Sequence, residues 1–134
     1  MSDPAVSVQR VTVDADPSEL NALRTRVGRA VRASGGTTSE VEDFELAVSE
    51  LATNVMRHTD AGDFAVVFTT TPDRWILDVS EADGLDDLDG LRRPSDCDCT
   101  GRGLFIVRAV MDDVSVVDDH GTRSIRCVRS RAAG

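Results

Sequence analysis

The chain has 134 residues, of which 40% are hydrophobic and 29% are charged, so we expect one folded domain, residues 1–134, with a core of its own. Its formal net charge of −9 at pH 7 argues against direct binding of DNA or RNA, which requires a cationic surface. All fifteen basic residues are Arg, and the absence of Lys excludes a P-loop lysine and Schiff-base catalysis.

The N-terminal part of the chain predicts a strand followed by a helix. It has no signal-peptide core, and no apolar run approaches the roughly 20 residues that span a bilayer, so a cytoplasmic protein without membrane contact is expected. Apolar and polar residues alternate over residues 6–13, which is typical of a strand. Asp16 and Pro17 then predict a helix start, and Gly35-Gly36 predicts the end of that helix after Ser34.

A second helix, capped by Thr38 or Ser39, is the stretch around which the chain is organised. It carries an apolar stripe with spacings of three and four residues, formed by Val41, Phe44, Val48, Leu51 and Val55. Beside the stripe lie Glu50, Asn54 and His58, each four residues from the next, which places them on one face of the helix. A polar row next to a core stripe is unlike a freely solvated face. A functional row is favoured, and a purely structural one is the alternative.

The second half of the chain predicts two strands, a loop, a short helix and a closing hairpin. The strands are expected at 64–71 and 75–80, the loop at 81–100, the helix at 103–111, and the hairpin at 114–117 and 122–128. This order predicts an α/β two-layer sandwich, in which a mixed, mainly antiparallel sheet has about three helices on one face. A loop of this length is typical of a lid or a binding element, although it could also be merely long.

The loop contains two candidate sites. Cys97 and Cys99 lie two residues apart, but no second Cys/His pair has the spacing of a zinc site, and an odd number of cysteines argues against a disulfide framework. At the end of the loop, Gly101, Arg102, Gly103 and Leu104 open the expected short helix. Glycines let a ligand approach the backbone closely, and helix N-termini favour phosphate groups.

These residues resemble a known family. The stretch Glu50 to Asn54 is similar to the N-box of the Bergerat-fold (GHKL) ATPase superfamily. Within that superfamily the run GRGLFIV, followed by MDDV at 111–114, most resembles the anti-sigma-factor serine/threonine protein kinases of bacterial stress and sporulation switches. Gly121-Thr122 matches the closing G-T motif, and the resemblance covers about residues 6–130.

The resemblance implies ATP and Mg²⁺ as cofactors and gives a role to each matching residue. Asn54 would bind Mg²⁺ through its amide oxygen, and Glu50 would accept or orient the proton of the attacking hydroxyl. The loop from Gly101 to Leu104 would hold the phosphates, with Arg102 also balancing transition-state charge. Thr122 would reach adenine, while a structural role at the helix end is favoured for His58.

One motif departs from the family pattern. The family expects Asp-x-Gly-x-Gly after the strand, where the Asp accepts a hydrogen bond from the adenine amino group. Here Glu81 stands in place of the Asp, and Asp83 stands in place of the first Gly. Glu can accept the same bond, but its extra methylene moves the carboxylate by roughly 1 Å or more.

Two functions follow. The first is an ATP-dependent serine/threonine protein kinase that acts as an anti-sigma factor, sequesters a sigma factor and phosphorylates an anti-anti-sigma (STAS-like) partner. The alternative is a regulatory protein that binds ATP weakly or not at all and captures a partner through the same fold. The N-box and the GRGL motif favour the kinase, whereas Glu81 and Asp83 favour the alternative. A homodimer is expected by analogy with the family.

Overall fold

The computed structural model describes residues 6–58, 62–81, 105–119 and 122–131. For Arg57, His58 and Glu81, and for residues 116–119 and 122–124, it describes the backbone only.

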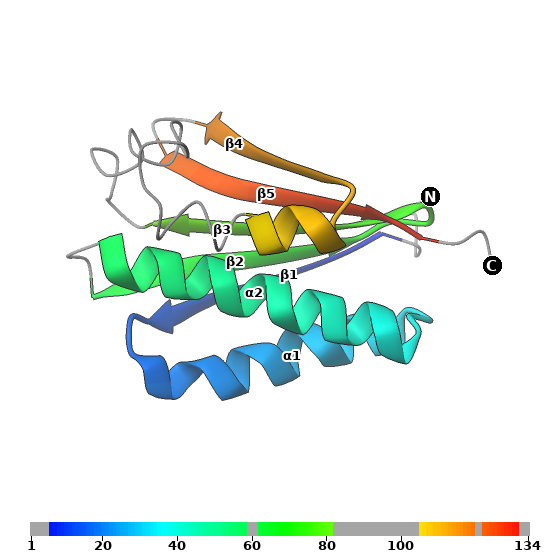
Figure 1. Ribbon diagram of the computed structural model, residues 1–134, viewed down its shortest axis with the longest axis horizontal. Coiled ribbons are helices and arrows are strands. Elements are labelled where there is room, and N and C mark those ends of the chain that lie inside the picture. The colour runs from blue at the N-terminus through cyan, green and yellow to red at the C-terminus, as the bar shows by residue number, and fades with distance from the viewer. Residues whose placement is uncertain (1–5, 59–61, 82–104, 120–121, 132–134) are drawn as a thin grey trace.

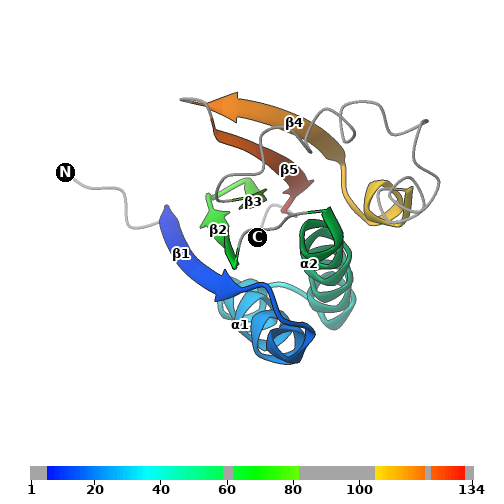
Figure 2. The ribbon, with the colours of Figure 1, turned by 90° about the vertical axis from the view of Figure 1, so that its left-hand side faces the viewer.

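Five strands form one sheet, and the helices pack on one face of it (Figures 1 and 2). The strands follow the order β1-β2-β3-β5-β4, and every pairing between them is antiparallel. This confirms the predicted α/β class and the layer arrangement, with an antiparallel sheet as the observed form. In chain order the elements are β1 (Ser7–Asp14), the 3-10 turn η1 (Pro17–Glu19), α1 (Leu20–Ala33), α2 (Thr38–His58), β2 (Asp63–Thr70), β3 (Arg74–Glu81), a helical segment at 105–110, β4 (Asp113–Asp119) and β5 (Thr122–Ser130).

The core lies between α2 and the helix-facing side of the sheet. Alternate residues of β2 are buried, as the period of a strand with one covered face requires. The predicted apolar stripe of α2 is buried throughout its length, from Val41 at 5% exposure to Val55 at 2%. At its centre Phe44 makes edge-to-face contacts with Phe68 and Trp75, whose ring centroids lie 5.5 and 5.6 Å away. Aromatic pairs in this geometry are favourable beyond the area they bury.

Both ends of the first helical stretch form as the sequence predicted. The Asp16 carboxylate accepts a hydrogen bond from the backbone N–H of Ser18 at 3.0 Å, ahead of the single 3-10 turn that leads into α1. At the other end Gly35 has a φ of 97°, and the N–H of Gly36 donates to the carbonyl of Val31 at 2.9 Å. This is a Schellman ending, which satisfies carbonyls of the last helical turn.

The N-cap predicted for α2 was wrong. The cap is Thr37, not Thr38 or Ser39, because the Thr37 hydroxyl accepts from the backbone N–H of Glu40 at 3.1 Å. The Glu40 carboxylate accepts in return from the backbone N–H of Thr37 at 2.8 Å. Thr37 and Glu40 therefore form a capping box, which requires an acidic residue or Gln three positions after the cap.

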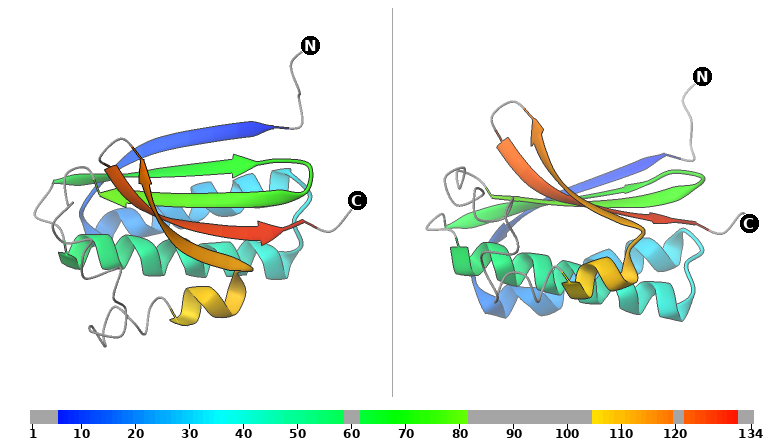
Figure 3. Two further views of the ribbon diagram at one scale, coloured as in Figure 1. Left: turned by 90° about the horizontal axis from the view of Figure 1, so that it is seen from above. Right: turned by 45° about the horizontal axis from the view of Figure 1, so that its top comes forward.

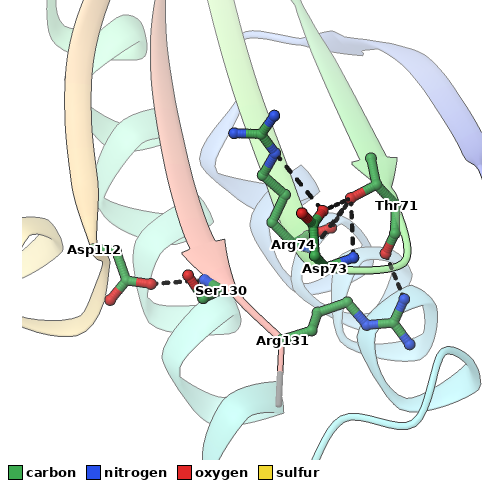
Figure 4. Close-up of polar contacts among 6 residues, drawn as sticks. All are labelled: Thr71, Asp73, Arg74, Asp112, Ser130 and Arg131. Atoms are coloured by element: carbon green, nitrogen blue, oxygen red, sulfur yellow. Dashed lines mark hydrogen bonds and ion pairs between the residues drawn. The ribbon is translucent and has the colours of Figure 1, made fainter. Parts of the chain in front are cut away.

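Arg131 connects the β2–β3 turn to the C-terminal end of α1 (Figure 4). Its backbone N–H donates to the carbonyl of Asp73 at 2.9 Å, and its guanidinium donates to the carbonyls of Thr71 and Ser34. The guanidinium also lies 5.3 Å from the ring centroid of Trp75, whose indole N–H donates to the Ser34 hydroxyl at 2.8 Å. A cation at the Ser34 carbonyl stabilises the C-terminal end of α1.

Among the described helices, none combines the length and apolar composition of a membrane-spanning helix.

The buried thiol of Cys127 makes stability depend on pH in the alkaline range. Burial, followed by the charges of Asp78 and Asp113, raises the pKa of Cys127 from 9.0 to about 12. The unfolded chain therefore releases this proton at a lower pH than the folded protein. Stability from the neutral thiol is complete below pH 9 and is lost as the pH rises towards 12. As the pH rises through this window, the free energy of unfolding of wild type should fall relative to that of Cys127→Val. The fall should be at most about 1.4 kcal/mol per pH unit.

The measurement is urea unfolding of both proteins at about pH 8 and about pH 10, on either side of the ordinary thiol pKa. Cys97 and Cys99 are present in both chains, so their contribution cancels. Equal pH dependence in the two proteins would contradict the prediction.

Candidate functional site

The candidate site lies at one end of the sandwich, where three elements meet. The C-terminal end of α2, the end of β3 and the start of β5 lie at the same end of the molecule (Figures 1 and 3). The register explains part of this arrangement, because Ser80 near the end of β3 pairs with Ser124 near the start of β5. The elements that carry Glu50, Asn54, Glu81 and Thr122 therefore converge.

Asn54 is the most informative residue of this site. It is 4% exposed, and its side-chain Nδ2 atom has no hydrogen-bond partner among the described residues. A buried polar group without a partner costs about 1–3 kcal/mol, so such groups are rare in folded proteins unless they serve a function. The amide is thus positioned to interact with something other than the described part of the chain.

Glu50 lies one helical turn before Asn54 and is half-buried. Within the described part of the chain it forms neither an ion pair nor a hydrogen bond. Asp43, on the same helix, is in contrast paired with Arg129. A half-buried carboxylate with no ion-pair partner among the described residues is available to accept a proton or a hydroxyl hydrogen bond.

The side of α2 that carries Asn54 lies next to the helical segment at 105–110. Positions 43, 50 and 54 fall on one side of a helix, and Arg129 joins Asp43 on that side to the carbonyl of Val110. Val107 and Met111 are buried in the same core cluster as α2. Figure 2 shows the segment beside α2. The chain that follows the GRGL motif is therefore packed next to the polar row.

The other predicted site residues are placed only in part. Glu81 is the last residue of β3 and pairs with Phe64, and Thr122 is the first residue of β5 and pairs with Asp119. Their side chains are outside the description, as is that of His58 at the end of α2. The remaining predicted residues, Asp83, Gly101, Arg102, Gly103 and Leu104, together with Cys97 and Cys99, lie outside the described residues.

The donor set fits Mg²⁺ bound together with a phosphate ligand. No group of three or more His, Cys, Asp or Glu side chains that could hold a metal occurs in the described ranges. Mg²⁺ commonly uses only one or two protein oxygens, with substrate phosphates and waters as its other ligands. The Oδ1 atom of the Asn54 side chain can serve as one such ligand, and the unpartnered Nδ2 of the same amide can donate a hydrogen bond to a phosphate oxygen.

Sequence reasoning missed two features of the surface. Arg129 was not singled out, because its partner Asp43 lies 86 residues away and no local pattern links the two. An open groove of about 990 Å³ between β1 and α1 was also missed. Its lining includes Gln9, Arg26 and Arg29 but no described residue of α2.

Known proteins share this arrangement. A model of the histidine kinase-like ATPase domain matches residues 13–128. The serine-protein kinases RsbW of Bacillus cereus and of Bacillus thuringiensis subsp. konkukian are each 28% identical over 112 residues, which cover 74% of this chain and 70% of the relative. These matches confirm the resemblance that the sequence motifs indicated.

A solved structure shows the same fold. The crystal structure of the RsbU and RsbW domains of Rv1364c from Mycobacterium tuberculosis matches with a TM-score of 0.68 at 17% identity. The match covers 95% of this chain and 34% of the solved one, so this chain spans about a third of the length of the solved chain.

The unpartnered amide predicts that removing Asn54 stabilises the protein in the absence of ligand. Asn54→Leu keeps a similar side-chain shape and removes the buried donor, so the free energy of unfolding should rise by about 1–3 kcal/mol. Thr53→Val, on the preceding residue and half-buried, is the matched control and should change stability by less than about 1 kcal/mol. Urea unfolding of the three proteins measures both effects. A loss of stability in Asn54→Leu would show that the amide has a structural partner.

Proposed function

Because the chain belongs to the histidine kinase-like ATPase family, we propose that it binds Mg-ATP at the polar row of α2 and phosphorylates a Ser or Thr of a partner protein. One observation carries the proposal, namely the buried Nδ2 donor of Asn54 without a partner in the described part of the chain, on a side chain one turn from that of Glu50. The relatives named serine-protein kinase support the activity.

Asn54 and Glu50 have different roles in this proposal. Asn54 would hold Mg²⁺ through its amide oxygen, and its Nδ2 would donate a hydrogen bond to a phosphate oxygen. Mg-ATP, when bound, supplies the phosphoryl group and the positive charge that screens the triphosphate. Glu50 accepts the proton of the partner's Ser or Thr hydroxyl, or orients that hydroxyl through a hydrogen bond. Glu50 is half-buried, so its carboxylate is only partly accessible to solvent.

The remaining roles rest on the family resemblance. Gly101, Gly103 and Leu104 would contact the phosphates, and Arg102 would also balance the charge of the transition state. Glu81 would accept from the adenine amino group in place of the family's Asp, next to Asp83, and Thr122 would contact the base. The convergence of β3 and β5 beside the end of α2 supports the grouping of Glu81 and Thr122.

The partners are proposed from the same resemblance. They are a sigma factor, which the protein would sequester as an anti-sigma factor, and an anti-anti-sigma STAS-like protein, which it would phosphorylate. A homodimer is proposed on the same basis.

One observation favours the alternative, a non-catalytic regulator that captures a partner. The groove between β1 and α1 is lined by Arg26 and Arg29, and neither forms an ion pair within the described residues. In a chain with a net charge of −9, two such arginines in a groove form a local basic surface that complements an acidic segment of a partner protein. Such capture would not require phosphoryl transfer.

Replacement of Glu50 separates binding from catalysis. Glu50→Gln keeps the shape of the side chain but cannot accept a proton, so Mg-ATP should still bind while phosphoryl transfer falls roughly 10²-fold or more. Calorimetry measures binding, and transfer of labelled phosphate to a purified partner measures catalysis. Asn54→Leu, in contrast, should lose metal-dependent binding. Transfer at the wild-type rate by Glu50→Gln would exclude Glu50 as the base.

Partner capture distinguishes the two functions. Proteins captured from a lysate with and without ATP should be identified and mapped for phosphorylated Ser and Thr. Arg26→Glu combined with Arg29→Glu should lose the captured partner and keep Mg-ATP binding, whereas Arg10→Glu, an exposed control on β1 that does not line the groove, should keep both. Capture without ATP binding at millimolar nucleotide would establish the non-catalytic function.

A further inference from the structure

Arg129, near the end of β5, connects three parts of the structure through one nitrogen atom. Its Nη1 donates to the carboxylate of Asp43 on α2 and, at 3.0 Å, to the backbone carbonyl of Val110. The side chains of Arg129 and Asp43 are 22% and 25% exposed, so the pair is screened by solvent less than a surface ion pair. We call Arg129, Asp43 and the Val110 carbonyl the Arg129 clamp.

The clamp acts on the side of α2 that carries the polar row. Asp43 precedes Glu50 by seven positions, or about two helical turns and roughly 10 Å along the axis. Positions 43, 50 and 54 therefore lie on one side of α2. Through Asp43, Arg129 fixes the distance between this side of α2 and the carbonyl end of the segment at 105–110.

The segment at 105–110 depends on such anchoring. A helix of this length is not stable in isolation, so its orientation comes from its contacts. Val107 and Met111 are buried, whereas Phe105 at the other end is 72% exposed. Polar contacts between described residues gather at the carbonyl end, where Arg129 bonds to Val110 and the backbone N–H of Asp112 donates to the carbonyl of Val128 at 2.9 Å. Within the described part of the chain, the segment is thus held mainly from its C-terminal end.

We propose that Arg129 is a positioning residue for the nucleotide site: it sets the orientation of residues 105–110 relative to the row of Glu50 and Asn54. This inference rests on the proposed function, because Mg-ATP is the ligand whose affinity it predicts. Arg129 is bonded to neither Glu50 nor Asn54, so it acts through the segment and α2. A displacement of about 1 Å at a site is enough to weaken binding or catalysis strongly.

Arg131 provides a matched control two residues along the chain. It also uses its guanidinium to join backbone carbonyls, but those belong to Ser34 and Thr71, at the turns that follow α1 and β2. Loss of Arg131 should therefore loosen that region without reaching the segment at 105–110. Arg129→Gln and Arg131→Gln remove comparable guanidinium contacts from different elements.

Two measurements test the clamp, one without nucleotide and one with it. In the ligand-free protein, Arg129→Gln should speed amide hydrogen exchange in residues 105–111 roughly tenfold and leave exchange in α1 unchanged. Arg131→Gln should instead speed exchange in α1 and leave exchange in residues 105–111 unchanged. In Mg-ATP titrations by calorimetry, Arg129→Gln should raise the Kd roughly tenfold, and Arg131→Gln should leave it within about twofold of wild type. Asp43→Asn should act like Arg129→Gln, and the double variant should be less than additive.

The outcomes separate the clamp from the proposed function. Unchanged exchange in Arg129→Gln, or faster exchange with an unchanged Kd, overturns the positioning role. Equal effects of Arg129→Gln and Arg131→Gln on the Kd also overturn it, because they would reflect general loss of stability. If the wild-type protein binds no Mg-ATP, the proposed function fails, and the exchange rates then decide by themselves whether Arg129 holds the segment.

Discussion

The packing of α2 against the sheet is the constraint on which the rest of the structure depends. Phe44 lies edge-on to both Phe68 and Trp75, and these contacts fix the rotation of α2 about its own axis. With that rotation fixed, the side of the helix at positions 43, 50 and 54 has one possible orientation. The polar row is therefore placed by the hydrophobic core, and a residue at position 50 or 54 could not leave its place without repacking the aromatic cluster.

The sequence was sufficient wherever the determining interaction is local. Period-two alternation located the strands, spacings of three and four located the core stripe of α2, and Gly35-Gly36 located the end of α1. The missed N-cap at Thr37 was also local, and Glu40 three positions later is the signal that identifies it. The Asp43–Arg129 pair could not be predicted in this way, because 86 residues separate the partners and no local pattern links them.

Only the part of the site that lies on α2 could be predicted from residue spacing. The spacing of Glu50 and Asn54 places them on one face, but it gives no information about whether the Asn54 amide has a partner. That property depends on what the sheet and the segment at 105–110 bring to the helix, so it required the fold. The roles of Glu81, Asp83, Thr122 and the residues from Gly101 to Leu104 remain predictions from the family resemblance.

The size of a groove and the presence of a buried polar atom without a partner indicate different ligand sites in this protein. The buried polar atom is the stronger indication. The groove between β1 and α1 is large, but its arginines are near water and cost little free energy when the groove is empty. The Nδ2 atom of Asn54 is buried and lacks a partner in the described ranges, so it costs free energy until an acceptor such as a phosphate oxygen takes its hydrogen bond. A ligand that does so binds the folded state and not the unfolded one, and it therefore recovers stability as it binds. In the proposed site, the free-energy cost of the ligand-free state is therefore located at the residue that binding would satisfy.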